Sequence, residues 1–162
     1  MFSGKLTTAL TTNSATARYP LGYIYVQPAS DTDGQGEKHW IYVYNDETAT
    51  AFAKGHVIMR DSATATYDGV LSTNAAAPCR LRLLGVAQHA ITAGYYGFIL
   101  KQGIGEVLAA TAGFTADGPI VADAVNGAAE DMAAGEEHLV FGSAIDSASS
   151  TALGTCYINC GG

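Results

Sequence analysis

Short hydrophobic runs recur along the chain and are separated by glycine, aspartate, asparagine or proline. The runs are rich in Val, Ile, Tyr, Phe and Leu, which is the composition of β-strands. We expect strands at residues 23–27, 39–45, 56–61, 80–88, 95–103, 105–110, 118–123, 137–145 and 154–159. Such short, closely spaced strands predict an all-β fold, either an antiparallel β-sandwich or a β-barrel-like (β-tulip-like) domain.

The pattern also predicts local details. Alternation in residues 80–83 directs Leu81 and Leu83 inward and the two neighbouring arginines, Arg80 and Arg82, outward. The strands at 95–103 and 105–110 form a predicted hairpin that turns at residues 103–105, where glycines permit positive φ. Helix formers occur at residues 46–55 and 126–137, and we expect one or two helical turns there at most.

Both faces are hydrophobic in the predicted strand GYYGFILKQG. Alternation directs Tyr96, Phe98 and Leu100 to one face and Tyr95 and Ile99 to the other. A strand of this kind needs cover on both sides. We expect one face to lie in the core of the domain and the other to contact a partner molecule, with Tyr95, Tyr96, Phe98 and Ile99 as interface residues.

Two regions differ in composition. Residues 1–19 are rich in Thr, Ala, Ser and Asn and show little periodicity, which predicts an extended N-terminal arm. Residues 20–162 have the length of a single β-rich domain. No hydrophobic run is long enough for a signal peptide or a spanning helix, so we expect synthesis in a cytoplasm and no contact with a membrane.

Cysteine usage fits a reducing compartment. Cys156 and Cys160 occupy positions i and i+4 of one predicted strand, about 13 Å apart, which is too far for a disulfide. We expect both of them, and Cys79, to be small buried hydrophobic side chains.

Charge narrows the range of partners. Charged residues are 14% of the chain, against roughly 25% in an average soluble protein, so part of the surface is expected to be hidden in an assembly. The formal net charge is −7 and the eight Lys and Arg residues are scattered. A nucleic-acid binder needs a basic stripe for the phosphates, so we expect no direct contact with DNA or RNA.

One loop partly matches a calcium-binding pattern. Asp31, Asp33 and Gly36 fit a D-x-D-x-D-G loop, but Gln35 stands at its fifth position and Tyr42 where a bidentate Glu is required. We therefore interpret this stretch as a polar turn between two strands.

Other motifs of catalysis or cofactor binding are incomplete. The GIGE sequence at 103–106 lacks the third glycine and the helix of a dinucleotide site, and Ser143 lacks the second glycine of a nucleophile elbow. The histidines do not have the spacing of a helical metal site: His39, His56, His89 and His138. We expect no catalytic residues, no metal, no cofactor and no enzymatic activity.

The second half of the chain resembles the capsid decoration (cement) proteins of tailed bacteriophages, especially the small all-β proteins of marine phages. Those sequences pair a G-V-A … I-x-A-G … Y/W-G-x-I segment with two later G-x-x-V steps. The matching positions cover about half the chain: Gly85, Val86, Ala87, Ile91, Ala93, Gly94, Tyr96, Gly97, Ile99, Gly103, Glu106, Val107, Gly118 and Val121.

The resemblance implies a structural protein of the virion, made in the host bacterial cytoplasm. Such proteins bind the outer surface of the phage head, commonly as homotrimers, and stabilise contacts between major capsid protein subunits. An N-terminal arm often lies along the capsid or a neighbouring subunit, which residues 1–19 suit because such an arm can order on contact.

Three alternatives remain. The first is another virion part, a head fibre or a tail-tube subunit. The second is a small trimeric β-enzyme such as a nucleotide hydrolase. The third is a carbohydrate-binding module in which Trp40, Tyr42 and Tyr44 form a stacking platform, although three alternating aromatic residues are also typical of a core strand.

Overall fold

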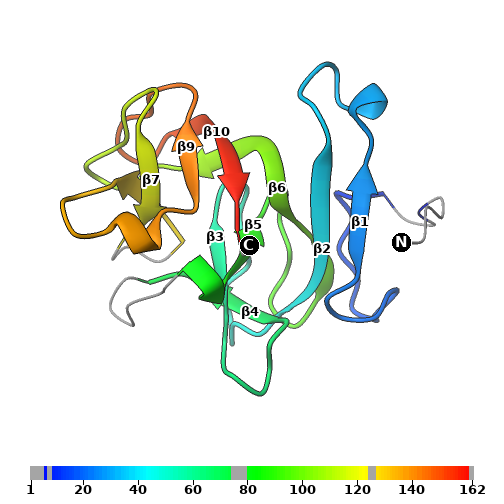
Figure 1. The fold of residues 1–162 in the computed structure, drawn as a ribbon. Coiled ribbons are helices and arrows are strands. Elements are labelled where there is room, and N and C mark those ends of the chain that lie inside the picture. Colours follow the sequence, from blue (N-terminus) through cyan, green and yellow to red (C-terminus); the bar gives the residue numbers. More distant parts are fainter. Residues whose placement is uncertain (1–5, 7–8, 74–79, 124–126, 161–162) are drawn as a thin grey trace.

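The computed structural model describes residues 6, 9–73, 80–123 and 127–160. The predicted all-β fold is confirmed (Figure 1). Its strands are β1 (Ile24–Gln27), β2 (Lys38–Asn45), β3 (Val57–Arg60), β4 (Asp68–Leu71), β5 (Leu83–Val86), β6 (Tyr96–Leu108), β7 (Pro119–Ala122), β8 (Ala129–Asp131), β9 (Gly142–Ala144) and β10 (Leu153–Asn159). The helical segments of the described residues are 3-10 turns: η1 (Ala29–Asp31), η3 (Arg80–Arg82) and η4 (Glu137–Leu139).

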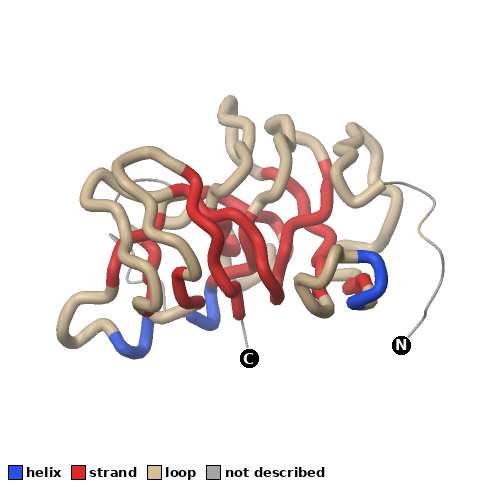
Figure 2. Tube along the Cα trace, turned by 90° about the horizontal axis from the view of Figure 1, so that it is seen from above, coloured by secondary structure: helices blue, strands red, loops and turns tan. Residues whose placement is uncertain are grey.

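Five strands close into a barrel. Hydrogen-bonded neighbours run in the order β2-β4-β3-β5-β6, and β6 then pairs with β2 to complete the ring. All these pairs are antiparallel except β2–β4, which is parallel. β1 adds to the outer edge of β2, and β10, β9, β7 and β8 continue from the far half of β6 as a second sheet. Seen from above, the strands fill the middle and long loops project from them (Figure 2).

The barrel has a hydrophobic interior. Alternate side chains of the barrel strands point inward, and Phe52 and Ile91 join them from two loops that pair with each other. The interior cluster is Ile41, Val43, Phe52, Ile58, Leu71, Leu84, Ala87, Ile91 and Ile99. Because these side chains are buried and pack against one another, the barrel interior is a packed core.

A larger hydrophobic core lies outside the barrel. The other face of β2 and β6 contributes Tyr42 and Phe98, which pack beneath Tyr19 and Tyr23. The second sheet packs on the far side of the ring with Val107, Phe114, Ile120, Phe141, Cys156 and Ile158. Both faces of the first half of β6, around Phe98 and Ile99, are therefore covered by this chain itself.

β6 is one continuous strand of 13 residues, so the predicted hairpin at residues 103–105 is wrong. Its first half pairs with β2 and its second half pairs with β10, so the strand passes from the barrel to the second sheet. Gly103 has φ +120°, and a Cβ there would lie 3.0 Å from the carbonyl oxygen of Glu37. The glycine therefore allows the backbone of Glu37 to lie close to β6 and allows the strand to bend, and the chain does not reverse direction there.

Several smaller expectations are also corrected. Leu81 is 73% exposed, because the 3-10 turn η3 interrupts the alternation before β5, whereas Leu83 is buried as predicted. Residues 46–55 contain no helix and form a loop in which Phe52 pairs with Ile91. The described part of 126–137 contains β8 and turns in place of the expected helix, and residue 126 lies outside the described residues.

The described part of the predicted arm lies on the barrel. Ser14 and Tyr96 exchange two backbone hydrogen bonds of 3.0 and 2.9 Å, and the Asn13 side chain donates to the carbonyl of Ala90. Tyr19 stacks on Tyr23 with ring centroids 5.3 Å apart. Residues 1–5 and 7–8 of the arm lie outside the described residues, and no helix of the described part is long and apolar enough to cross a membrane.

Two of the three cysteines lie in the core. Cys156 and Cys160 are fully buried, as expected for small hydrophobic side chains. Burial raises the pKa of the Cys156 thiol to about 12, so it stays protonated and unreactive at neutral pH. Cys79 lies outside the described residues.

Candidate protein-binding surface

The outer face of the second sheet is built by alternation along β10. Gly154, Cys156 and Ile158 point into the core, so Leu153 and Tyr157 point outward. The register pairs these two positions with Leu108 and Ile104 of β6. The outward positions of three neighbouring strands therefore form one continuous face.

This face carries an unusual share of exposed hydrophobic side chains. Among the described residues, seven large hydrophobic side chains are exposed, and three of them lie here: Ile145 at 42%, Leu153 at 40% and Tyr157 at 41%. The half-buried Ile104 and Leu108 continue the patch on β6. We call the following set the β10 surface: Ile104, Glu106, Leu108, Ile145, Leu153, Thr155 and Tyr157.

A shallow hollow adjoins the β10 surface next to Tyr157. It has a volume of about 270 Å³ and a mainly apolar lining formed by Pro119, Val140, Phe141, Gly142, Ser143, Tyr157 and Asn159. A hollow of this size is large enough for one or two side chains of a partner protein, and buried anchors in such pockets dominate binding energies.

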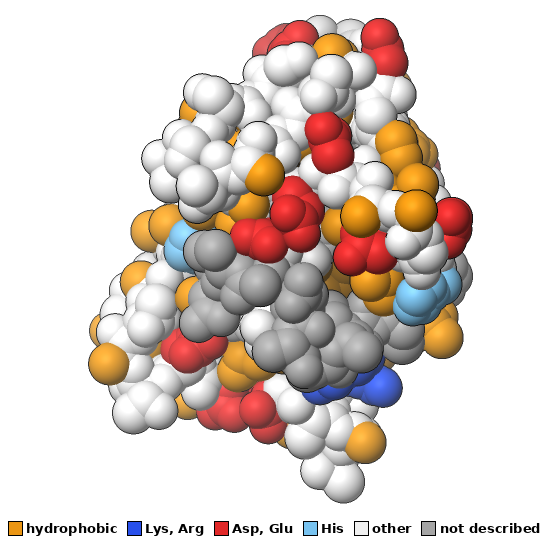
Figure 3. Space-filling model, turned by 90° about the vertical axis from the view of Figure 1, so that its left-hand side faces the viewer, with side chains coloured by type: hydrophobic (Ala, Val, Ile, Leu, Met, Phe, Trp, Pro, Cys, Tyr) orange, Lys and Arg blue, Asp and Glu red, His pale blue; other side chains and the backbone are white. Residues whose placement is uncertain are grey.

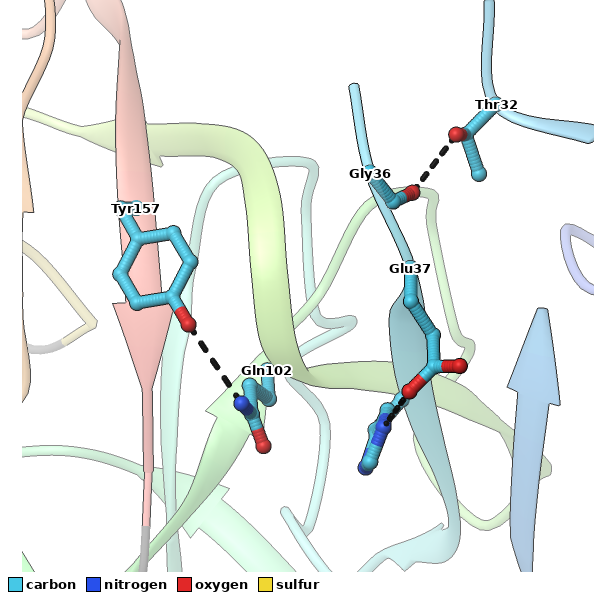
Figure 4. Close-up of polar contacts among 6 residues, drawn as sticks. Thr32, Gly36, Glu37, Gln102 and Tyr157 are labelled. Atoms are coloured by element: carbon cyan, nitrogen blue, oxygen red, sulfur yellow. Dashed lines mark hydrogen bonds and ion pairs between the residues drawn. The ribbon is translucent and has the colours of Figure 1, made fainter. Parts of the chain in front are cut away.

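Polar groups border the hydrophobic patch (Figure 4). The Gln102 amide donates to the Tyr157 hydroxyl at 3.4 Å, and Gln102 is the strand partner of His39. The His39 ring lies 2.7 Å from the Glu37 carboxylate. Within the β10 surface, Glu106 pairs with Thr155 between the two hydrophobic pairs and forms an ion pair with Lys54. A protein–protein interface usually combines hydrophobic side chains with polar groups of this kind.

The four predicted interface residues lie on the barrel, away from the β10 surface. Phe98 is 1% exposed beneath the arm, and Ile99 is fully buried inside the barrel. Tyr95 and Tyr96 are half-buried, so a partner can reach them, and their interface role stays a prediction. The sequence did not reveal the β10 surface, because residues 153–158 place hydrophobic side chains at both parities.

Residues 31–37 form the predicted polar turn. The Thr32 hydroxyl donates to the Gly36 carbonyl at 2.6 Å, and Asp33, Gly34 and Gly36 have positive φ. No group of three or more His, Cys, Asp or Glu side chains is placed to hold a metal ion anywhere in the described part of the chain.

Two of the three residues of the predicted aromatic stacking platform are buried, and the third, Tyr44, is half-buried. Trp40 and Tyr42 are 6% and 2% exposed, and the Trp40 indole N–H donates to Gln27 Oε1 at 3.0 Å. Tyr42 packs against Phe98 with ring centroids 4.9 Å apart. Both Trp40 and Tyr42 belong to the core, because Leu10, Tyr19 and Tyr23 pack against the cluster that contains them.

Acidic side chains gather on the end of the molecule that carries β7 (Figure 3). There Glu130 of β8 lies beside Asp123, and burial together with a hydrogen bond to Asp123 raises the pKa of Glu130 to about 7. The neighbouring charges of Glu136 and Asp131 act in the same direction. Glu130 is thus partly protonated at neutral pH.

We expect the substitution Glu130→Gln to stabilise the protein at pH 8 by about 1 kcal/mol, a value discounted for the partly solvated site. The raised pKa means that Glu130 favours folding below its unfolded pKa and loses that contribution as pH rises through about 7. The gain should therefore shrink toward pH 5. Urea unfolding at both pH values measures it, with Asp146→Asn as an exposed control. An equal gain at both pH values would contradict the assignment.

Comparison with known proteins identifies a shared fold. No protein-family model matches the sequence, and no curated protein does so. A solved structure, described as the head fibre gp8.5 N base of bacteriophage phi29, matches with a TM-score of 0.53 at 12% identity. The match covers 75% of this chain and 94% of that chain. The chain thus has the fold of the base of a phage head fibre.

Proposed function

We propose that this chain is a non-enzymatic structural protein of a tailed-phage virion that sits on the outside of the head. The observation that carries the proposal is the fold shared with a head fibre base over 94% of that protein's length. The sequence resemblance to capsid decoration proteins points to the same location independently. The net charge of −7 suits a protein that binds the outside of a DNA-filled shell.

The β10 surface is the proposed contact with the major capsid protein. Its three exposed hydrophobic side chains, 40–42% accessible, lose that exposure on binding, and the adjoining hollow accepts an anchoring side chain. The rim of Glu37, His39 and Gln102 supplies polar groups that set orientation.

Two specific roles follow from the two lines of support. A decoration protein, acting as a trimer, clamps neighbouring capsid subunits and stabilises the shell. A head fibre base attaches to the shell and carries further protein. The sequence resemblance favours the first role and the shared fold favours the second.

Co-sedimentation with expanded, undecorated shells of the cognate major capsid protein tests the proposal. We expect saturable binding at a fixed ratio. Heating the decorated shells then separates the roles, because a clamp raises the temperature at which shells break and a fibre base leaves it unchanged. A folded protein that stays in the supernatant at micromolar concentration would rule out both.

The variant Leu153→Ser/Tyr157→Ser should weaken shell binding about thirtyfold or more, because loss of a central aromatic anchor costs about 2 kcal/mol or more. Both side chains point outward, so the fold should survive. The matched control is Leu81→Ser, which removes a side chain that is 73% exposed at η3. If the control weakens binding and the double variant does not, the contact lies elsewhere.

A further inference from the structure

The outer edge of β1 is open. β1 is a terminal strand of the sheet, its strand partner among the described residues is β2, and it is the outermost strand at the right of Figure 1. The Tyr42 N–H donates to the Tyr23 carbonyl at 2.9 Å, so alternation directs the backbone groups of every second residue from Tyr23 toward β2. The N–H and C=O groups of Ile24 and Val26 therefore point away from the sheet, and no described residue forms a hydrogen bond to them.

β1 lacks the features that usually keep an exposed strand edge from pairing. Its sequence, Ile-Tyr-Val-Gln, contains no charged residue and no proline, and its pairing with β2 contains no bulge. The opposite end of the sheet differs. There β8 has three residues, two of which are the charged Glu130 and Asp131. The Ala110 N–H also donates to the Ala129 carbonyl of β8 at 2.7 Å. One end of the sheet is thus protected against pairing, and the β1 end is not.

Exposed hydrophobic side chains gather at the open edge. Of the seven large hydrophobic side chains exposed among the described residues, three lie at or beside the start of β1: Leu21 at 39%, Ile24 at 45% and Tyr67 at 38%. A Cβ at Gly22 would lie 2.5 Å from ring atoms of Tyr67, so this ring lies against the segment that enters β1. Tyr25 points to the other face of the strand and packs against the core. The open edge and the hydrophobic patch therefore coincide.

The geometry of β1 favours an antiparallel copy of itself as the partner. A second β1 strand placed with Tyr25 on a twofold axis sets Ile24 of each copy opposite Val26 of the other. In this register every outward N–H and C=O group of both strands finds a hydrogen-bond partner. Ile24 and Val26 then form hydrophobic cross-strand pairs on one face. Because β1 carries no charge, the contact brings no like charges together, although each chain has a net charge of −7.

We propose that this chain forms a dimer through antiparallel pairing of two β1 strands. The sheets of the two copies become continuous, and the Ile24 side chain of each copy loses exposure against Val26 of the other. The contact is isologous, so it closes with two copies. It is small for a specific interface, and we expect a dissociation constant of about 10–100 μM. It uses no residue of the β10 surface and does not depend on the proposed function.

Sedimentation velocity of the purified protein at about 5–500 μM measures the association. We expect the mass to rise from that of one copy to that of two. Val26→Pro removes an outward N–H and should weaken the dimer at least about tenfold, whereas Val26→Thr keeps the backbone donor and should change it by less than about twofold. Circular dichroism checks that each variant is folded.

Three results would overturn the proposal. The first is a parent protein that stays monomeric at about 500 μM, which would leave the edge of β1 to a strand of another protein. The second is a dimer that survives Val26→Pro in the folded state. The third is a dimer that Leu153→Ser/Tyr157→Ser abolishes, because association would then use the β10 surface. Shell co-sedimentation, which tests the proposed function, is measured separately.

A cysteine on the twofold axis tests the register without the proline variant. Tyr25 of the two copies would face each other at a non-hydrogen-bonded position, where Cα atoms lie about 4.5 Å apart and a disulfide fits. Tyr25→Cys should therefore give a disulfide-linked dimer with oxidised glutathione. Ala29→Cys, an exposed site in η1 beyond the end of β1, should cross-link no more than the parent, whose native cysteines give the background. Equal cross-linking of the two variants would contradict the proposed pairing.

Discussion

Replacing Phe98 with alanine is expected to destabilise the fold by about 3–5 kcal/mol, because the substitution removes a buried aromatic ring and leaves a cavity. Phe98 is 1% exposed, and its ring centroid lies 4.9 Å from that of Tyr42 and 5.3 Å from that of Tyr19. The ring packs between the barrel and the segment that precedes β1. Its loss should therefore weaken the packing of that segment on the barrel.

Chemical unfolding followed by far-ultraviolet circular dichroism measures this effect. The control is Tyr157→Ala, which removes an aromatic side chain that is 41% exposed and should cost below about 1 kcal/mol. A near-wild-type stability for Phe98→Ala, combined with loss of partner binding, would support the sequence-based assignment of Phe98 to an interface and contradict its role in the core.

The second large effect is expected at Gly85, where alanine should cost about 3 kcal/mol because the site has no room for a methyl group. A Cβ at Gly85 would lie 2.5 Å from the carbonyl oxygen of Leu100 and 3.0 Å from its carbonyl carbon. The obstacle is backbone, which cannot rotate away. The change falls where β5 meets β6, beside the Val86–Leu100 pair that helps to close the barrel.

Gly135→Ala is the matched control. Gly135 has φ +94° and open space around its Cα, so alanine there meets left-handed strain of about 1–2 kcal/mol but no clash. Thermal unfolding of both variants separates the two causes. If Gly135→Ala proves the more damaging change, close backbone packing at β5 and β6 is not what restricts Gly85.

The proposed function on the phage head separates the substitutions that affect folding from those that affect binding. Phe98 and Gly85 act on the fold, whereas Leu153 and Tyr157 act on the outer face of the second sheet. A variant of the first class should lose binding only through loss of folded protein. A variant of the second class should lose binding at full stability, which makes the β10 surface testable independently of the core.

The strands were the most predictable part of this protein. β2 and β7 lie where the hydrophobic runs place them, because Val, Ile, Trp and Tyr favour extended backbone and the flanking residues favour turns. β4 and β8 were missed. Their short sequences, Asp-Gly-Val-Leu and Ala-Glu-Asp, have weak strand propensity and become strands because a neighbouring strand offers hydrogen-bond partners.

The structural role of Gly103 could not be predicted from the local sequence. A glycine between two hydrophobic runs is typical of a hairpin turn, and residues 103–105 fit that pattern. In the structure the same glycine allows a single strand to bend past the backbone of Glu37. A hairpin turn and a bent strand differ only in which distant segment lies next to Gly103, and the tertiary fold determines that segment.

The candidate sites were also beyond local sequence. Ile145 precedes Tyr157 by a long loop, and the register of β9 with β10 brings their stretches together on one face. A hollow beside β1 combines residues 10–11 with the β1–β2 loop and Trp40. Each of these surfaces is assembled from segments that are distant in the sequence, and the hydrophobic pattern of each segment alone does not indicate a binding site.

The sequence by itself determined the all-β class and most strand positions, since these depend on propensity, alternation and turn residues that act over a few neighbours. It also indicated that GYYGFILKQG needs cover on both faces. Only the tertiary structure decided what provides that cover: the barrel interior on one face and Tyr19 and Tyr23 on the other. Strand pairing and barrel closure depend on contacts between distant segments, and they determine which hydrophobic side chains become core and which stay exposed.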